Sequence, residues 1–148
     1  MIKLTGVTHP DGSQTRYVYN QNGWIWKAVN PRGITQVENL YSQDGRVVRQ
    51  VHADGGSFDF SYTVDGATKN VLETRMTGPG GGVWTHQFNA SGYETSRTDP
   101  LGAATTFHRD GNIQTAITDA LGRKTTWTFD TQGNVATVTA PDGQVTTY

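Results

Sequence analysis

The chain has 148 residues, a net charge of −1 at pH 7 and no cysteine, which suits one domain or a piece of a larger protein. Its scattered charges exclude a basic surface for nucleic acid or for anionic membranes. The absence of cysteine excludes disulfides and thiolate chemistry. No apolar run approaches the roughly 18 residues of a membrane span, and the first residues lack the apolar core of a signal peptide.

The composition favours strands over helices. Threonine occurs 23 times and aromatic residues 15 times, whereas leucine occurs only five times. Since β-branched and aromatic side chains suit a pleated surface, these counts indicate an all-β chain. The longest stretches without glycine have 11 residues, such as 34–44, and they hold few strong helix formers.

Glycines divide the chain at regular intervals. Six of them follow an aromatic residue by four positions: Tyr19/Gly23, Tyr41/Gly45, Tyr62/Gly66, Phe88/Gly92, Phe107/Gly111 and Phe129/Gly133. A second set alternates with these: Gly12, Gly33, Gly55, Gly82, Gly102, Gly122 and Gly143. Apart from the interval between Gly66 and Gly82, the spacing is 9 to 12 residues, which fits a strand, a turn and the next strand. We therefore predict an all-β fold of repetitive antiparallel hairpins with about 12 strands, open or partly curled, and no substantial helix.

In chain order, polar and proline residues lead into turns that end on glycine. The expected turns are 9–12, 20–23, 30–33, 42–45, 63–66, 89–92, 99–102, 108–111, 119–122, 130–133 and 140–143. One turn of each glycine set makes a repeat of 20–22 residues, so residues 1–148 form a single array of about six repeats. The segment 66–82 departs from this spacing, and it is interpreted either as a bend or register jump or as a loop insertion of small entropic cost.

Period-2 alternation assigns the aromatic residues to one face of the strands. The residues expected to share a face are Thr15, Tyr17 and Tyr19, then Phe58, Phe60 and Tyr62, then Trp84, His86 and Phe88, then Thr125, Trp127 and Phe129. The aliphatic residue two positions after a hairpin glycine is expected to pack against the aromatic residue four positions before it. The predicted pairs are Tyr19–Ile25, Tyr41–Val47, Phe107–Ile113 and Phe129–Val135.

The sequence contains no motif for catalysis, metal binding or cofactor binding. The histidines His9, His52, His86 and His108 lack metal-ligand spacing, and aspartates before glycines are ordinary turn residues. No serine lies in Gly-x-Ser-x-Gly, and the glycine-rich segment 78–82 lacks the Lys-Ser/Thr of a phosphate loop. We therefore expect no enzymatic activity, no metal and no cofactor.

Aromatic side chains are the remaining candidates for binding. One interpretation is that they form the apolar face that holds the sheet together. Trp24 and Trp26 alternate with Ile25 and fall on the other, exposed face, where their rings would stack on sugars. Both interpretations of these two tryptophans stay open.

The repeat resembles the YD repeat of the Rhs family, which also occurs in toxin-complex B and C subunits, WapA-type proteins and teneurins. The resemblance lies in Tyr-Val-Tyr-Asn-Gln-Asn-Gly at 17–23, Ile-Thr-Asp-Ala-Leu-Gly-Arg at 117–123, Trp-Thr-Phe-Asp-Thr-Gln-Gly-Asn-Val at 127–135 and Thr-Asp-Pro-Leu-Gly at 98–102. It extends over nearly the whole chain. The aspartate after the aromatic residue occurs once, as Asp130, and is otherwise Asn20, Ser42, Thr63, Asn89 or His108.

The resemblance implies a structural role. In relatives such repeats wind into a β-spiral that closes as a hollow shell around a toxin polypeptide. We expect this chain to be a fragment of a larger bacterial protein, secreted or on the cell surface, whose partners are a polypeptide cargo, neighbouring repeats or a second copy bound through sheet edges or the apolar face. The alternative is a carbohydrate or cell-surface binding module that uses exposed aromatic side chains.

Overall fold

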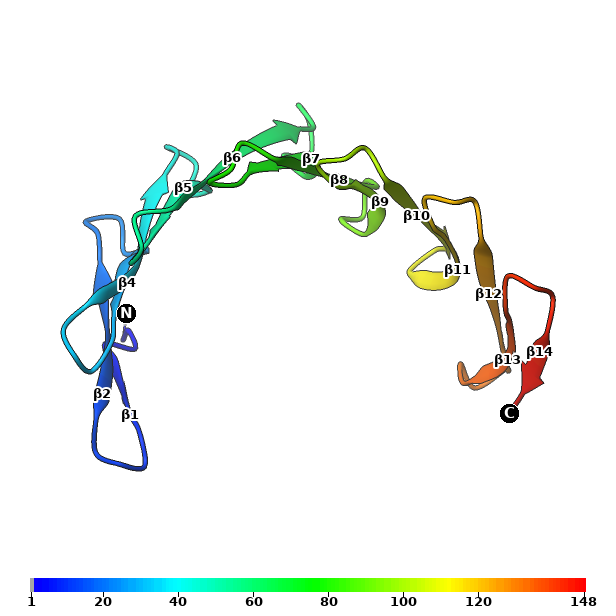
Figure 1. The fold of residues 1–148 in the computed structure, drawn as a ribbon, viewed down its shortest axis with the longest axis horizontal. Helices are drawn as coiled ribbons and strands as arrows, with labels where there is room; N and C mark the ends of the chain where they lie inside the picture. Colours follow the sequence, from blue (N-terminus) through cyan, green and yellow to red (C-terminus); the bar gives the residue numbers. More distant parts are fainter. Residues whose placement is uncertain (1) are drawn as a thin grey trace. The chain divides into compact units, whose positions relative to one another are not determined.

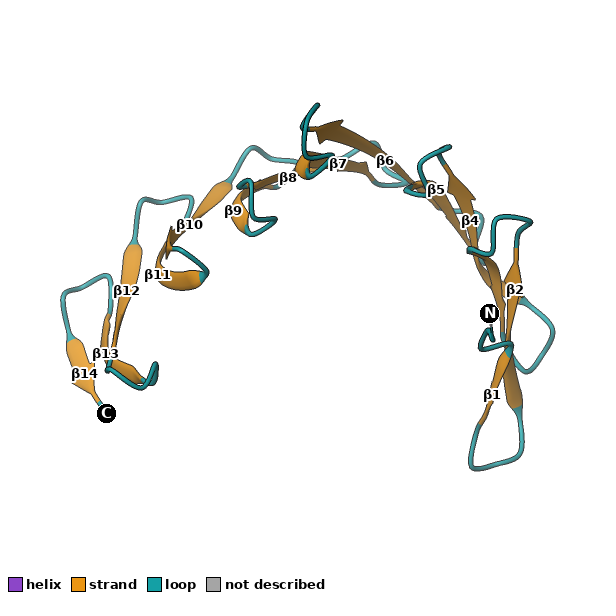
Figure 2. Cartoon of the chain, turned by 180° about the vertical axis from the view of Figure 1, so that it is seen from behind, coloured by secondary structure: helices purple, strands orange, loops and turns teal. Residues whose placement is uncertain are grey.

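The computed structural model describes residues 2–148, which form 14 β-strands joined by turns and contain no helix (Figure 2). The strands are β1 Gly6–Thr8, β2 Gln14–Tyr19, β3 Ile25–Val29, β4 Thr35–Tyr41, β5 Val47–His52, β6 Ser57–Val64, β7 Val71–Thr77, β8 Val83–Phe88, β9 Glu94–Thr98, β10 Ala104–Asp110, β11 Ile113–Thr118, β12 Lys124–Phe129, β13 Val135–Thr139 and β14 Val145–Thr147. Within each of the chain's two compact units the strands lie in the sheet in their chain order, and from β1 to β6 and from β8 to β14 each strand runs antiparallel to the one before it (the strands are labelled in Figure 1). The predicted all-β hairpin fold is confirmed, with two strands more than expected.

The chain divides into two compact units. Unit 1 comprises Met1–Ser61 with Met76–Gly81, and unit 2 comprises Tyr62–Arg75 with Gly82–Tyr148. Unit 1 holds β1 to β5, and unit 2 holds β8 to β14. Within each unit the strands contact their neighbours along the chain.

One type of turn recurs along both units. In the turn 20–23, the Gly23 amide donates to the Asn20 carbonyl (2.9 Å) and the Asn20 amide donates to the Trp24 carbonyl (2.9 Å). Gly23 has a φ of 84°, so this is a three-residue loop in which a type I turn is followed by a bulge glycine. The same two bonds close the turns 9–12, 30–33, 42–45, 52–55, 89–92, 99–102, 119–122, 130–133 and 140–143.

The first residue of many turns also closes the loop with its side chain. Asn89 Oδ1 accepts hydrogen bonds from the amides of Ser91 (3.0 Å) and Tyr93 (3.0 Å). These amides have no strand partner inside the loop, so an amide or carboxylate oxygen at this position satisfies them. The same pair of bonds occurs at Asn30, Asp99, Asp119 and Asp130. Asparagine and aspartate at the first turn position thus form the same pair of hydrogen bonds with the loop amides, at 2.8–3.0 Å.

The turn expected at 63–66 lies further along the chain. β6 continues through Val64, and a longer turn then runs from Asp65 to Asn70. In it the Lys69 amide donates to the Asp65 carbonyl (3.0 Å), and Lys69 rather than Gly66 adopts a positive φ (61°). Asp65 Oδ1 holds this loop by accepting from the amides of residues 67 and 68.

The turn expected at 108–111 also lies further along the chain, and in the irregular segment 66–82 the glycine with positive φ is Gly81 rather than Gly82. β10 continues through Asp110, which lies opposite Ile113, so the loop contains only Gly111 and residue 112. A glycine with φ of 58° at the first loop position is typical of a tight type II′ hairpin. In the segment 78–82 the residue with positive φ is Gly81, whereas Gly82 packs beneath a proline of the next turn.

The register of the strands confirms most of the predicted cross-strand pairs. Ile25 lies opposite Tyr19, Val47 opposite Tyr41 and Val135 opposite Phe129. The predicted Phe107–Ile113 pair is wrong, because the tight loop moves the register and places Ile117 opposite Phe107.

Alternation along the strands gives each unit one face lined with half-buried rings. In β2, Thr15, Tyr17 and Tyr19 are half-buried while the residues between them are exposed, as predicted. We call this surface the aromatic face; in unit 1 it contains Tyr17, Tyr19, Tyr41, Phe58 and Phe60, and in unit 2 Trp84, Phe88, Phe107, Trp127 and Phe129. All ten rings stay partly exposed to solvent.

Very little of the described chain is buried. In residues 2–148 the buried hydrophobic side chains are Val29, with 9% of its surface exposed, and Ala116, with 3%. The accessible surface is 9930 Å², whereas a globular protein of this mass would expose about 7,400 Å². The aromatic faces are thus covered by no second layer from the described residues.

Substitution of turn glycines tests the turn geometry. Gly45 has a φ of 84°, and a Cβ there would lie 2.9 Å from Trp24 Cζ2, so Gly45→Ala is expected to lower the free energy of unfolding by about 1–2 kcal/mol or more. Gly66 lacks a positive φ and has no atom within 4 Å of a Cβ, so Gly66→Ala is expected to be neutral or slightly stabilising. Urea unfolding followed by circular dichroism measures both. Equal destabilisation by the two substitutions would contradict this assignment of turns.

Stability is expected to fall in acid because turn carboxylates accept hydrogen bonds. The Arg123 amide lowers the pKa of Asp119, the Asn134 side chain lowers the pKa of Asp130, and the Thr68 amide lowers the pKa of Asp65 from the usual 3.8. A carboxyl with a lowered folded pKa contributes stability above its unfolded pKa, and this contribution is lost as the pH falls through the folded value. The urea midpoint should therefore stay level down to about pH 5 and drop below about pH 4.

A matched variant separates this effect from general acid unfolding. Asp130→Asn keeps an oxygen acceptor for the loop amides and removes the titrating group, so its urea midpoint should drop less between pH 5 and pH 2.5 than that of the unsubstituted chain. An identical acid response in both proteins would show that Asp130 carries none of the pH dependence.

Candidate functional site

The two tryptophans singled out by the sequence line one shallow cavity in unit 1. Its volume is about 410 Å³. Trp24, Trp26 and Tyr41 supply the rings. The other lining residues are Asn20, Asn22, Asn39, Leu40, Ser42 and Gln43. The cavity therefore combines aromatic surface with amide and hydroxyl groups, and the role of Trp24 and Trp26 in binding stays a prediction.

Trp24 is held in place by the aromatic face of unit 1. Its ring centroid lies 5.1 Å from that of Tyr41, whose hydroxyl donates to the Ile25 carbonyl (2.6 Å). Asn39 Nδ2 donates to the same carbonyl (3.0 Å), and Gln50 Nε2 donates to Asn39 Oδ1 (2.9 Å). Side chains of β4 and β5 and a backbone carbonyl of β3 are thus joined by hydrogen bonds, which fixes the wall of the cavity.

Trp26 is the more exposed of the two rings, with 38% of its surface accessible. Its Nε1 donates to Glu38 Oε1 (2.9 Å), and Lys27 Nζ lies 4.0 Å from the ring centroid. Lys27 Nζ also lies 3.3 Å from Glu38 Oε2. The ammonium group covers one face of the indole through a cation–π contact, and the accessible surface that remains is available to a ligand.

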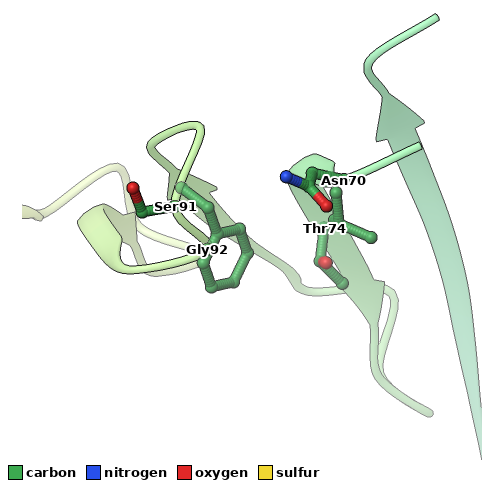
Figure 3. Close-up of a pocket in the computed structure, with 6 residues that line it drawn as sticks. Asn70, Thr74, Ser91 and Gly92 are labelled. Carbon is green, nitrogen blue, oxygen red and sulfur yellow. The ribbon is translucent and has the colours of Figure 1, made fainter. Parts of the chain in front are cut away.

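A second cavity of about 250 Å³ lies in unit 2 between two turns (Figure 3). Figure 3 shows Asn70 and Thr74 on one side of it and Ser91 and Gly92 on the other. Asn70 Nδ2 donates to the carbonyl of residue 90 (2.8 Å), which ties the two turns together. Phe88, a member of the aromatic face, lines this cavity as well.

A third cavity, of about 410 Å³, lies in unit 2 beside the aromatic face. The residues that line it are Trp84, His86, Arg97, Thr98, Asp99, Ala103 and Thr105. We call it the Arg97 cavity. The sequence analysis did not identify it, although alternation along β8 and β9 would have placed His86 and Arg97 on one face.

The six aromatic residues and six glycines that define the repeat lie in strands and turns, respectively. The aromatic members Tyr19, Tyr41, Tyr62, Phe88, Phe107 and Phe129 are half-buried. The glycine members Gly23, Gly45, Gly92, Gly111 and Gly133 have positive φ, and Gly66 does not. The hydroxyls of Tyr19 and Tyr41 donate to backbone carbonyls at 2.7 Å and 2.6 Å, a hydrogen bond that phenylalanine at these two positions could not form.

The histidines of residues 2–148 lack the arrangement of a catalytic triad. His9 and His108 lie 2.9 Å and 3.0 Å from threonine hydroxyls, and His52 lies 3.0 Å from a glutamine oxygen. His86 Nδ1 lies 2.5 Å from Glu94 Oε1. None of these rings joins a hydroxyl to a carboxylate, which nucleophilic catalysis of that type requires.

The described residues hold neither a cluster of metal ligands nor a helix that could span a membrane. Among residues 2–148, no three His, Cys, Asp or Glu side chains converge as metal ligands. No helix in the described chain has the length and apolarity to cross a membrane. On β5 and β6, Arg49 Nε lies 2.6 Å from Asp59 Oδ1 and lowers the pKa of that carboxyl, as is usual for an exposed ion pair.

Comparison with known family models finds a match to a repeat family in the C-terminal part of the chain. The family model described as RHS Repeat matches residues 107–147. No curated protein matches the chain.

Solved structures share its fold. The crystal structure of TcdB2-TccC3 superposes with a TM-score of 0.66 at 12% identity, covering 90% of this chain and 8% of that one. The Photorhabdus luminescens Tc holotoxin pore gives 0.58 at 16% identity, covering 98% and 9%. The chain thus spans less than a tenth of these proteins. Residues 107–147 carry an RHS repeat, and the chain as a whole resembles the Rhs/YD-repeat family in its repeated sequence and in its fold.

Proposed function

We propose that the chain is a structural repeat module of an Rhs/YD-repeat protein and forms part of a β-shell that encloses or presents a toxin or effector polypeptide. One observation carries this proposal: each unit has an aromatic face that stays half-exposed in residues 2–148. A sheet must cover its apolar face with another layer, a partner or a cargo. Covering this surface would stabilise an assembly by roughly 25 cal/mol per Å² of apolar area removed from water.

The comparisons support the same role. The two solved structures are those of TcdB2-TccC3 and of a Tc holotoxin pore, so the shared fold occurs in a toxin complex. The partners of this chain are then a cargo polypeptide and adjoining repeats of a longer bacterial protein that is secreted or carried on the cell surface. The strand edges of β1 and β14 are where adjoining repeats or a second copy would pair. The role is one of enclosure rather than catalysis.

Footprinting of the full gene product tests the shell. Hydroxyl radicals should label Tyr17 and Trp127 on the aromatic faces more strongly after the cargo segment is deleted, because the cargo then no longer shields them. Leu40, which is 47% exposed and alternates with Tyr41 in β4, should be labelled equally in both proteins. Equal labelling of Tyr17 and Trp127 with and without cargo would overturn the proposal.

The second candidate is carbohydrate binding by the cavity of unit 1. It is favoured by the exposed part of the Trp26 ring beside the Asn22, Asn39 and Gln43 side chains, since sugars stack on indole and hydrogen-bond to amides. Trp26 lies at the surface, so its removal should change ligand binding more than folding.

A glycan array compares the chain with two single variants. Trp26→Ala should lose at least tenfold in affinity for any bound glycan, about 1.4 kcal/mol or more. Tyr93→Ala removes an aromatic side chain that is 37% exposed in unit 2 and should bind as the unsubstituted chain does. An array without hits, or equal binding by Trp26→Ala, would remove the carbohydrate proposal and leave the shell proposal intact.

A further inference from the structure

We propose that the Arg97 cavity binds the carboxylate of an acidic side chain on the polypeptide that covers the aromatic face of unit 2. The inference rests on the proposed shell function for the source of that polypeptide. It adds the chemistry of one contact, namely a glutamate or aspartate whose side-chain methylene groups lie on an indole ring.

The register places Arg97 at the centre of three neighbouring strands. On β9 it lies directly opposite His86 of β8 and Thr105 of β10. Residues directly opposite one another in antiparallel strands share a face. Trp84 lies two residues from His86 along β8, and Phe107 lies two residues from Thr105 along β10. Because residues two apart in a strand share a face, Arg97 lies on the same face as both rings.

The donors of Arg97 are uncommitted. Its guanidinium carbon lies 5.1 Å from the centroid of Phe107, so the group stacks on a ring. Within residues 2–148 it forms no ion pair and has no hydrogen-bond acceptor. Arg109 is stacked in the same way on Tyr93, yet its Nε donates to the Glu94 carbonyl (3.3 Å) and its Nη1 to the carbonyl of residue 112 (3.2 Å). Stacking by itself thus leaves the guanidinium donors of Arg97 free for an external acceptor.

The acidic groups nearby are already occupied. Glu94 Oε1 lies 2.5 Å from His86 Nδ1. Asp99 Oδ1 accepts from the amides of Leu101 (2.8 Å) and Ala103 (2.9 Å) and so holds the turn 99–102. Asp99 accepts these bonds from uncharged amides, so the cavity is lined by a carboxylate as well as a guanidinium, and it is the guanidinium of Arg97 whose hydrogen-bond donors lack an acceptor among the described residues. A guanidinium presents a rigid fork of N–H donors that fits a carboxylate in two parallel hydrogen bonds.

An apolar wall completes the cavity. The Pro100 ring packs on Gly82, where a Cβ would lie 3.1 Å from proline carbons and 3.8 Å from Trp84 Cζ3. A side chain at position 82 would press on the Pro100 ring, which accounts for a glycine at a position without positive φ. The indole of Trp84 lines the cavity beside Arg97. The methylene groups of an acidic side chain would pack against the Trp84 indole, and its carboxylate would accept hydrogen bonds from the Arg97 guanidinium.

A pair of short peptides tests the proposal with the chain as it stands. The probes are Ac-Gly-Leu-Glu-Leu-Gly-NH₂ and the same peptide with glutamine in place of glutamate, titrated into the ¹⁵N-labelled chain. The glutamate peptide should shift the Trp84 indole and Arg97 Nε resonances and bind at least about tenfold more tightly than the glutamine peptide, since only the carboxylate pairs with the fork. Equal binding of the two peptides, or no shift at either resonance, would overturn the proposal.

Two variants identify the group responsible. Arg97→Gln should abolish the preference for glutamate, whereas Arg16→Gln, an exposed arginine of β2 in unit 1, should leave it unchanged. Circular dichroism checks that both variants fold. If Arg97→Gln keeps the preference, or if free acetate shifts the two resonances as strongly as the peptide does, the cavity does not recognise an acidic polypeptide.

The outcome is independent of the footprinting result. Loss of the peptide preference with cargo-dependent labelling intact would refute the acidic contact and leave the shell. A preserved preference with no cargo-dependent labelling would refute the shell and leave a carboxylate site without an assigned partner.

Discussion

The structure depends on a sheet of single thickness with one apolar side. Each unit gathers half-buried rings on its aromatic face, and the buried hydrophobic side chains of the described residues are Val29 and Ala116 alone. Folding is therefore held by strand pairing and turns more than by a core. Since a domain normally buries its apolar surface between two layers, such a sheet is suited to assemble around something else. The shared fold with parts of toxin complexes is consistent with this physical demand.

The turns supply the rigidity that a core does not. In the recurring loop, a glycine accepts positive φ and an asparagine or aspartate at the first position satisfies two amides. Tyr19 and Tyr41 add hydroxyl bonds to carbonyls of a neighbouring segment. The polar side chains of the repeat thus form hydrogen bonds within their own hairpins. The aromatic rings remain partly exposed on one face of the sheet. At the position after the aromatic residue, Asn20, Ser42, Asn89 and Asp130 each accept a hydrogen bond from a loop amide, whereas Thr63 and His108 lie within strands.

Polar groups on the aromatic faces are placed by strand register. Arg97 and Arg109 both stack on rings, but only Arg109 donates to backbone carbonyls, and this difference distinguishes a structural arginine from one able to bind a ligand. The unit 1 cavity follows the same principle, because the contacts of Trp26 with Glu38 and Lys27 fix its ring and leave part of it exposed. Both cavities are shallow, as expected where no second layer closes over a sheet.

The sequence by itself determined the strands, most turns and the side of the sheet on which the rings lie, because alternation and turn glycines are local properties of the chain. It misplaced the turns near Gly66 and Gly111, since β6 and β10 continue through Val64 and Asp110, beyond the residues at which those turns were expected to begin. Only the tertiary structure showed that Pro100 packs on Gly82 and that Arg97, His86 and Thr105 form one row. Those arrangements join different hairpins, and they depend on register between strands rather than on the spacing within one.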